Sequence, residues 1–283
     1  IRLRFVAGML LALLAACRAA PDWPAPAPAI WQVTSPAGET GWLFGTVHAL
    51  PAGLEWRTPA LARVQAQAGV LLVEVADPST PRAAALLREL GETPGQPPLL
   101  ARVAPADRAD LAALLDRAGL DEADFAATES WAAALVLAGA VRQGDPANGV
   151  DRALIAEAET MEALETLEGQ LALFDRLPAP AQSALLSATA REAAADQSQA
   201  MLTAWLTGDE AALAALDQQA LLAQPILREA LLTGRNARWL GPIEAAITSN
   251  RRPLVAVGAA HLLGADGLPA LLGARGYRVA RLQ

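Results

Sequence analysis

Short apolar segments that lie far apart along the chain constrain the fold most. Three of them are "GWLFGTV", "GVLLVEV" and "PLVAVG". Their length and their content of branched residues are typical of buried strands. Long stretches rich in alanine and leucine separate them, and this composition favours helices. The alternation of single strands with long helical stretches predicts an α/β protein with a small mixed sheet and large helical insertions.

The first half of the chain is expected to begin with a β-hairpin. "AIWQVTS" and "GWLFGTV" are its strands, and "PAGET" between them contains turn residues. A helix is expected around residues 56–68, followed by a buried strand over residues 69–75. Residues 81–142 are expected to be largely helical, with breaks at 91–98 and 119–120.

The second half is expected to be mostly helical until its final unit. A helix opens after Gly149, and "MEALETLEGQLALF" is interpreted as a short strand followed by a helix. Residues 179–249 are expected to be almost continuously helical. Breaks in this helical region are expected near 208–209, 224–225 and Gly234. The final unit is expected to be a strand over 253–257, a helix over 265–275 and a strand over 277–282.

The first residues have the pattern of a bacterial export signal. Two arginines precede a short apolar run and then small residues before Cys17. "LAAC" resembles a lipobox, whose cysteine is lipidated. We therefore expect a lipoprotein signal peptide over 1–16, a Pro/Ala tether over 17–29 and one domain over 30–283. The expected location is the periplasmic side of a bacterial membrane, held there only by the lipid.

Composition excludes several classes of function. The net charge is −8 and all 22 basic residues are arginine, with no basic cluster. Nucleic acid is therefore not an expected partner, and a P-loop lysine or Schiff-base lysine is excluded. Cys17 is the only cysteine, which excludes an internal disulfide, a catalytic thiolate and a cysteine-ligated metal.

The two histidines follow the same local pattern. His48 lies in "GTVH" and His261 in "GAAH", each directly after an apolar strand candidate. In open α/β sheets, ligands bind beyond the carboxyl ends of the strands. Glu74 ends the strand candidate "GVLLVEV" and is expected at the same edge. We therefore expect these three side chains to share one crevice.

The residues themselves leave the use of this crevice open. Two imidazoles and a carboxylate can bind a divalent metal. The same groups can also act without metal, one histidine as a general base and the other as a stabiliser of an oxyanion. The chain has no Gly-x-Ser-x-Gly elbow, no His-Glu-x-x-His helix and no Gly-x-Gly-x-x-Gly after a strand.

The motifs together resemble those of the TraB/GumN family, the bacterial relatives of the animal TIKI proteases. The matching stretches, which span nearly the whole chain after the tether, are "WLFGTVHALPAGLEWRTPAL", "AGVLLVEV", "NGVDRALIAEAETMEALETLEGQLALFD", "GRNARWLGPI" and "PLVAVGAAHLLGADGLPALLGARGYRVARL". The resemblance implies a core similar to erythromycin-esterase-like and ChaN-like proteins. It also implies a metal site built from His48, His261 and Glu74.

Further residues enter through the same resemblance. The "LET" segment offers Glu165 as a further ligand or general base, against the alternative of a carboxylate cap on the following helix. The "GRN" segment offers Arg235 and Asn236 for substrate binding, against a structural salt bridge of the arginine. Asp151 is interpreted mainly as a helix-start residue. Two departures, a glutamate-rich "ETMEALET" and Ala76 after Glu74, leave these motifs intact.

The leading hypothesis is an exported, lipid-anchored hydrolase, a metal-dependent peptidase acting on peptides or proteins. The expected cofactor is a divalent ion, Mn²⁺, Co²⁺ or Zn²⁺. One alternative is a metal-free, esterase-like hydrolase that uses the same histidines. Another is a periplasmic protein that binds haem, metal or a signalling peptide without turnover. The sequence predicts no oligomeric state.

Overall fold

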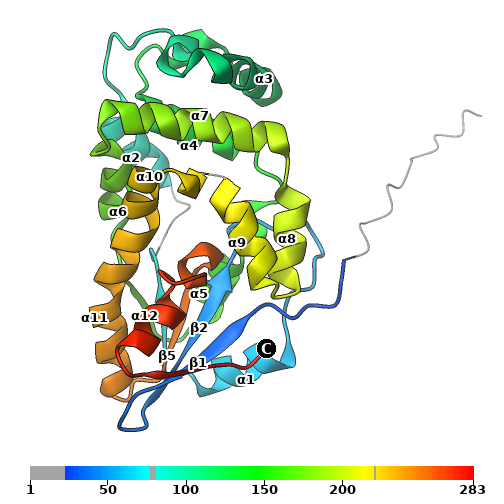
Figure 1. The fold of residues 1–283 in the computed structure, drawn as a ribbon, viewed down its shortest axis with the longest axis vertical. Coiled ribbons are helices and arrows are strands. Elements are labelled where there is room, and N and C mark those ends of the chain that lie inside the picture. Colours follow the sequence, from blue (N-terminus) through cyan, green and yellow to red (C-terminus); the bar gives the residue numbers. More distant parts are fainter. Residues whose placement is uncertain (1–22, 77–80, 220) are drawn as a thin grey trace, which may run out of the picture.

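The computed structural model describes residues 23–76, 81–219 and 221–283 (Figure 1). The expected signal peptide, Cys17 and the start of the tether lie outside the described residues. Residues 23–29 form no regular element and lead into the first strand. Along the described residues, no helix combines the length and the apolar character needed to cross a membrane.

Within the described residues, one mixed sheet has the strand order β4-β3-β5-β2-β1-β6. Its strands are β1 (Ile30–Thr34), β2 (Thr40–Thr46), β3 (Val70–Val73), β4 (Met161–Ala163), β5 (Pro253–Gly258) and β6 (Arg278–Arg281). Strands β4, β3, β5 and β2 are parallel, whereas β1 pairs antiparallel with β2 and β6. The α/β class, the mixed sheet and the N-terminal hairpin are therefore confirmed.

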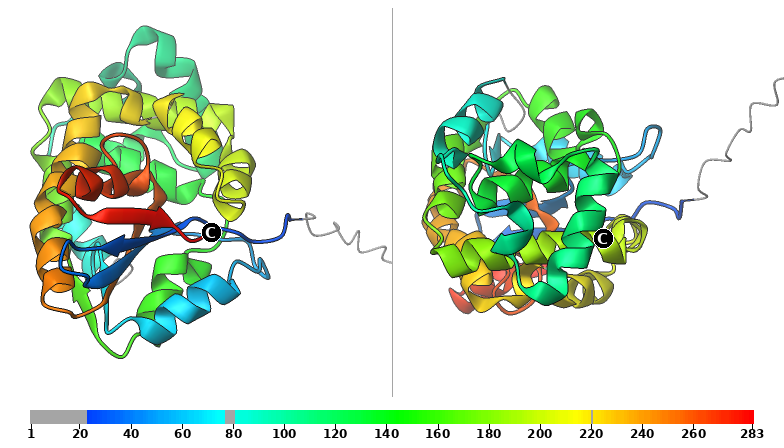
Figure 2. Two further views of the ribbon diagram at one scale, coloured as in Figure 1. Left: turned by 60° about the horizontal axis from the view of Figure 1, so that its bottom comes forward. Right: turned by 90° about the horizontal axis from the view of Figure 1, so that it is seen from above.

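Both faces of the sheet are covered by helices, which explains why the central strands β3 and β5 are apolar on both faces. In β5, Leu254 and Ala256 pack with one cluster, and Val255 and Val257 with the other. The helices that cover the first face are α1 (Pro59–Gln67), α5 (Val150–Glu157) and α8 (Ser198–Leu206). The second face packs against α11 (Gly234–Thr248) and α12 (Leu268–Ala274), which Figure 2 shows on the opposite side from α1.

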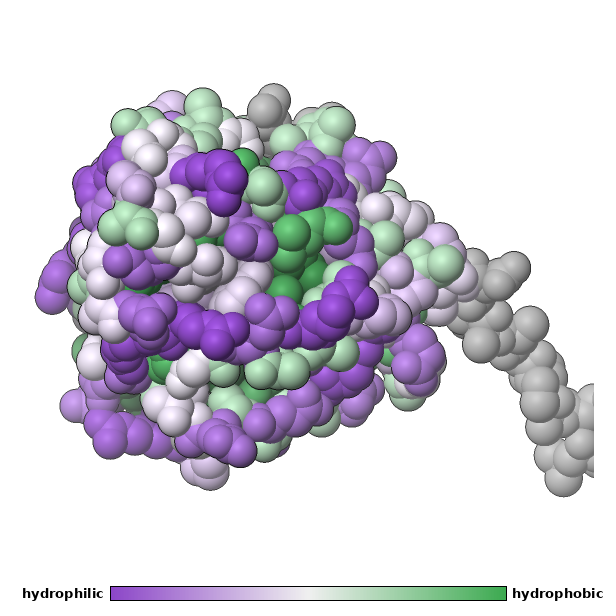
Figure 3. Space-filling model, turned by 90° about the horizontal axis from the view of Figure 1, so that it is seen from below, coloured by the Kyte–Doolittle hydropathy of each residue, from purple (hydrophilic) through white to green (hydrophobic). Residues whose placement is uncertain are grey.

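A separate helical layer has its own core, which includes Leu111, Trp131 and Leu186. Its helices are α2 (Pro81–Gly91), α3 (Arg108–Ala118), α4 (Ser130–Ala140), α6 (Leu167–Asp175) and α7 (Ala179–Ala195). Figure 1 shows this layer beyond the arrowhead of β2, so it stands over the carboxyl ends of the parallel strands. The opposite end, seen in Figure 3, carries a small apolar area bordered by hydrophilic residues.

Short elements connect these layers. They are the 3₁₀ helices Leu99–Arg102, Pro105–Asp107, Glu122–Phe125, Pro146–Asn148, Leu221–Ala223 and Ala259–Leu262, with α9 (Glu210–Gln219) and α10 (Pro225–Arg228). The helix opened by Gly149 and the strand–helix unit in "MEALETLEGQLALF" are confirmed as α5, β4 and α6.

The predicted helix break near Gly234 is wrong. A π-helical turn over Glu229–Thr233 joins α10 to α11, and Gly234 itself has helical backbone angles. This glycine allows the backbone at residue 234 to lie close to the preceding turn, because a Cβ there would lie 2.7 Å from the carbonyl oxygen of Glu229. A break that was not predicted lies at Asp196, which ends α7 in the left-handed conformation with φ of 43°.

Substitution of Gly69 tests the packing at the start of β3. A Cβ at this position would lie 2.6 Å from the carbonyl oxygen of Arg251, so the Gly69→Ala variant must shift backbone at the edge of the sheet. We expect a loss of about 1–3 kcal/mol in the free energy of unfolding, measured in urea. Gly139→Ala, exposed on α4 with no atom within 4 Å, is the control and is expected to gain about 0.5–1 kcal/mol. Equal midpoints for the two variants would contradict this account.

Candidate functional site

The candidate site lies at the carboxyl ends of the parallel strands, where open α/β sheets bind ligands. Val73 of β3 pairs with Ala256, and Thr46 of β2 pairs with Gly258, so the central strands end side by side. Glu74, His261 and His48 follow these ends within a few residues. The local sequence and the strand register therefore place the three predicted side chains at one edge.

Glu74 is largely buried, with its side chain 12% exposed, and both of its carboxylate oxygens accept hydrogen bonds. Its Oε1 accepts the backbone N–H of Gly258 at 2.7 Å, and its Oε2 accepts Arg235 Nη2 at 2.5 Å and Gln170 Nε2 at 3.3 Å. Burial alone would raise the pKa of this carboxyl. The neighbouring His261, Arg235 and His48 and the Gly258 N–H outweigh burial and lower the pKa to about 2. Glu74 is therefore ionised at neutral pH.

Arg235 joins Glu74 to Glu165. It lies at the start of α11, is 7% exposed, and donates Nη2 to Glu165 Oε2 at 2.9 Å as well as to Glu74. Its guanidinium also lies 4.7 Å from the ring centroid of Trp239. Two buried carboxylates next to one another require such a cation. The salt bridge considered for Arg235 is thus present, and its role in substrate binding stays a prediction.

Glu165 does not cap the following helix. The N-cap of α6 is Thr166, whose hydroxyl accepts the N–H of Gly169 at 3.0 Å. The carboxylate of Glu165 turns instead to Arg235, and Arg238 lies 3.6 Å away. A small hydroxyl suits the capping position, which leaves the carboxylate for the site. Its role as a ligand or base stays a prediction.

His261 is held as a neutral ring. Its Nδ1 lies 2.7 Å from Asn236 Oδ1, and its Nε2 lies 3.2 Å from Arg235 Nη1. Since an arginine only donates, Nε2 accepts and Nδ1 carries the proton. Burial lowers the pKa of His261 to about 3, and the charge of Arg235 acts in the same direction, against the opposing effect of Glu74. The ring also packs on Trp239, with centroids 4.4 Å apart.

Asn236 orients His261. It is completely buried, and its amide nitrogen donates to the carbonyl oxygens of His261 at 3.2 Å and of Asp266 at 2.8 Å. These two bonds use the donors of the amide and leave Oδ1 for the imidazole. The structure therefore gives Asn236 a direct contact with His261, and its proposed contact with substrate stays a prediction.

His48 lies in a different environment from His261. Its side chain is 58% exposed, and its Nδ1 lies 3.2 Å from Asp151 Oδ2. The hydrogen bond to Asp151 raises the pKa of His48 above 6.5, although desolvation lowers it in part. From the sequence, Asp151 was interpreted mainly as a residue at the start of a helix, here α5. Its position in the motif "NGVD" was the only available signal that it belongs to the site.

The two Gly-x-x-His loops meet at Gly258. A Cβ on this glycine would lie 3.1 Å from Glu74 Oε1, 3.7 Å from His261 Cδ2 and 3.9 Å from His48 Nε2. The Nε2 atom of His261 is itself 3.8 Å from Glu74 Oε1. The absence of a side chain at Gly258 therefore leaves space bordered by Glu74 Oε1, His48 Nε2 and the ring of His261.

These donors fit a divalent ion in type, since imidazole nitrogen and carboxylate oxygen suit Mn²⁺, Co²⁺ and Zn²⁺. As the side chains lie, however, no group of three or more His, Cys, Asp or Glu in the described ranges is arranged to hold a metal. Arg235 Nη1 already lies 3.2 Å from His261 Nε2, one of the expected donor atoms. An ion at Gly258 would have to replace this contact.

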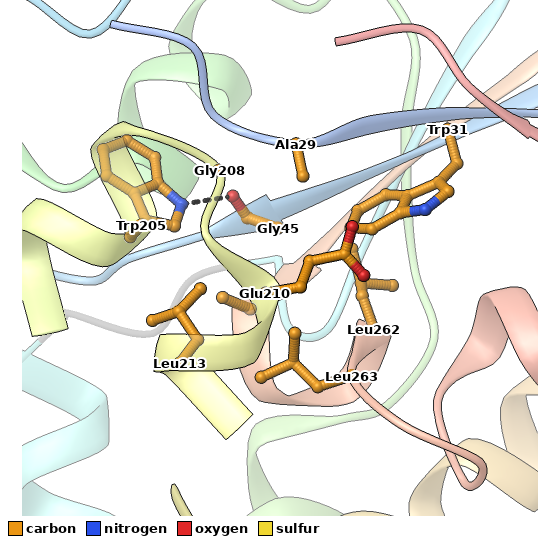
Figure 4. Close-up of a pocket in the computed structure, with 10 residues that line it drawn as sticks. Ala29, Trp31, Gly45, Trp205, Gly208, Glu210, Leu213, Leu262 and Leu263 are labelled. Carbon is orange, nitrogen blue, oxygen red and sulfur yellow. Dashed lines mark hydrogen bonds between the residues drawn. The ribbon is translucent and has the colours of Figure 1, made fainter. Parts of the chain in front are cut away.

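Two pockets lie elsewhere. The one in Figure 4 is apolar, lies between Trp205 and Leu262, and has a volume of about 10 Å³, which is space for one water at most. Trp205 Nε1 donates to the carbonyl oxygen of Gly45 beside it, at 2.8 Å. A polar pocket of about 280 Å³ near Trp42 and Arg252 lies at the start of the parallel strands. Neither contains a predicted site residue.

A comparison with protein families decides the affiliation of the chain. The model of the TraB/PrgY/gumN family matches residues 29–281. The chain belongs to the TraB/PrgY/gumN family. The matched range includes all six of the site residues that were predicted outside the N-terminal segment. A search of curated proteins found no match, and neither did a search of solved structures.

The two histidines of this TraB/PrgY/gumN protein are expected to titrate far apart. The imidazole of His48 should protonate with a pKa above 6.5, whereas that of His261 should stay neutral until about pH 3. Imidazole NMR signals recorded against pH measure both values, and the His48→Ala variant assigns them because the chain has only 2 histidines. Asp151→Asn should lower the first pKa and leave the second. Titration of both rings together near pH 6.5 would contradict the geometry.

Proposed function

We propose that this protein is a hydrolase that cleaves peptide bonds at the crevice around Gly258 with the help of a divalent ion. The observation that carries the proposal is the convergence of His48 Nε2, His261 and Glu74 Oε1 on the space beside Gly258. Two loops with the same motif on neighbouring strands supply these atoms. Glu74, which follows the neighbouring strand β3, brings its carboxylate within 3.8 Å of His261 Nε2.

His48, His261 and Glu74 would hold the ion. When bound, a divalent ion lowers the pKa of a water molecule and polarises a carbonyl group. Each Nδ1 is already hydrogen-bonded to the protein, which leaves Nε2 as the nitrogen for a ligand, although His261 Nε2 would first have to give up its contact with Arg235. Glu74 is ionised, so it needs no deprotonation before it binds a cation.

The other residues of the chain prepare this arrangement. Arg235 holds Glu74 and Glu165 in place, and the stacking of Trp239 on His261 limits rotation of the ring. The helical layer contributes Gln170, which donates to Glu74 and closes one side of the crevice. Glu165 is proposed as the further carboxylate of the site, near the exposed Arg238.

A second candidate is hydrolysis without metal, and one observation favours it. Arg235 already places a fixed positive charge within 3.2 Å of His261 Nε2 and 2.5 Å of Glu74. His48 is exposed and paired with a carboxylate, as a general base is when a third group orients it. In this mechanism His48 Nε2 takes the proton from water directly. An ester is then as suitable a substrate as a peptide.

The export and anchoring of the chain are part of the proposal. The pattern before Cys17 supports a lipidated N-terminus on the periplasmic side of a bacterial membrane. Substrates would then be peptides or proteins of that compartment. Labelling of the expressed chain with a radioactive fatty acid tests the anchor, and Cys17→Ser is the matched control that should lose the label.

Metal binding measured beside turnover separates the candidates. The purified chain is titrated with Mn²⁺, Co²⁺ and Zn²⁺ by calorimetry, and is assayed on a peptide library and on simple esters with and without chelator. About one bound ion, lost in the His48→Ala and His261→Ala variants, together with chelator-sensitive peptide cleavage, supports the leading proposal. Turnover that survives chelation supports the second candidate. Stoichiometric binding of peptide, haem or metal without turnover would overturn both and leave a binding protein.

A further inference from the structure

The segment that contacts the loop of His48 comes from a distant part of the chain. Val150 donates its N–H to the carbonyl oxygen of Val47 at 2.9 Å, and Leu50 and Asp145 exchange backbone hydrogen bonds at 3.4 and 2.9 Å. Residues 145–150 therefore pair with residues 47–50 on both sides of His48. This segment determines where the loop lies.

Gly149 lets the two segments approach this closely. A Cβ at Gly149 would lie 2.6 Å from the carbonyl oxygen of His48 and 3.0 Å from Asp151 Oδ1. A real Cβ essentially never comes so near a backbone oxygen. The glycine of the "NGVD" motif is thus required by the approach of α5 to His48. It brings the first turn of α5 against the imidazole.

Asp151 makes a contact with His48 that is not needed to form α5. The carboxylate lies in the first turn of the helix, where a negative charge is favourable, yet it does not act as an N-cap, since Gly149 occupies that position. Its Oδ2 contacts His48 Nδ1, and its Oδ1 is buried without a hydrogen-bond partner among the described residues. The geometry of this carboxylate is explained by the imidazole and not by the helix.

A carboxylate can only accept, so His48 Nδ1 must be the protonated nitrogen of the neutral ring. The lone pair is then on Nε2, the atom near Gly258 and Glu74. The same arrangement holds at His261, where Asn236 Oδ1 takes the place of the carboxylate. A free imidazole side chain prefers the opposite tautomer, so each loop needs a partner that reverses this preference.

We propose that Asp151 is a positioning residue that fixes the ring and the tautomer of His48, so that Nε2 faces the crevice. This proposal rests on the proposed function, because His48 needs a free Nε2 whether it acts as a metal ligand or as a general base. Asp151 makes no contact with substrate itself. Its effect passes through His48 alone, and His261 is independent of it.

The experiment is ¹⁵N NMR of the two imidazoles at a pH above the measured titration of His48, so that both rings are neutral. In the wild-type chain, both should show a protonated Nδ1. Asp151→Ala should convert His48 to the tautomer with a proton on Nε2 and leave His261 unchanged, which also shows that the fold is intact. Glu157→Ala, on the exposed side of α5, is the control.

Calorimetry with Zn²⁺ alone gives the second readout. Asp151→Ala should weaken binding about 10–100-fold, and Glu157→Ala should leave it unchanged. If the wild-type chain binds no ion, the metal part of the proposed function fails, while the tautomers still decide the role of Asp151. A His48 tautomer that is the same in wild type and Asp151→Ala overturns the proposal. Asp151→Leu, of similar size, replaces the alanine variant if that one does not fold.

Discussion

Replacement of Arg235 by methionine is expected to destabilise the protein by about 3–5 kcal/mol. The variant keeps the length of the side chain but removes the cation between Glu74 and Glu165, whose side chains are 12% and 11% exposed. Glu74 and Glu165 then remain part-buried without the cation that joins them. Urea unfolding followed by tryptophan fluorescence measures the loss.

Arg251→Met is the matched control for Arg235. Arg251 forms a two-pronged ion pair with Glu162 at 2.6 and 2.9 Å, but on the surface, where such pairs contribute about 0–1 kcal/mol. A similar loss of unfolding free energy in both variants would show that the ion pairs of Arg235 contribute no more to stability than the surface pair of Arg251. The ion pair would then no longer explain why the Glu165 side chain turns towards Arg235.

The cost of removing Arg235 should depend on pH. The pKa of Glu74 is lowered from 4.5 to about 2, so its contribution to stability is complete above pH 4.5 and is lost as the pH falls towards 2. In Arg235→Met the pKa of Glu74 moves back up. The difference in stability between variant and wild type should therefore shrink over this range. A constant difference would mean that packing, and not charge, is responsible.

Replacement of His48 by alanine is expected to abolish most of the activity and to leave the stability almost unchanged. His48 holds the ion in the leading proposal and takes the proton from water in the second candidate, and loss of a group that moves a proton in the transition state costs about 10²–10⁴-fold in kcat/KM. The ring is 58% exposed, so the free energy of unfolding should change by about 0.5 kcal/mol or less. Turnover of the best substrate from the library and urea unfolding measure the two effects on one preparation.

Two further variants sharpen the His48 result. His48→Gln keeps a polar side chain of similar length but cannot exchange a proton near neutral pH, so it should be as inactive as alanine. Arg57→Ala, in a surface ion pair with Glu157, should retain full activity. Activity of His48→Ala within a few-fold of the wild type would remove His48 from the reaction and leave His261 and Glu74 alone.

The sequence predicted the site better where strands were involved than where helices were. "GVLLVEV" and "PLVAVG" are buried on both faces, so their apolar runs stand out, and Glu74 and His261 could be placed at their ends. Gly234 was misjudged because a glycine looks the same whether it ends a helix or allows close approach inside one. The direction of the Glu165 side chain was open because Thr166 can cap α6 equally well.

The partners of the histidines could not be predicted for a different reason. Asp151 lies 103 positions from His48, and Asn236 lies 25 positions from His261. Each contact depends on how two elements pack and not on a local pattern. The erythromycin-esterase-like core, the metal and the lipid anchor stay predictions. The family and the mixed α/β sheet are established.

The central position of β5 has a consequence for biosynthesis. This strand lies between β3 and β2, yet it follows them late in the chain, as the bond between Glu74 and Gly258, 184 positions apart, illustrates. Until the ribosome has released the last part of the chain, β2 and β3 have unpaired edges facing one another. Such long-range pairing folds slowly, and open strand edges invite association with other chains. Until β5 pairs with both strands, the unfinished sheet is therefore open to aggregation.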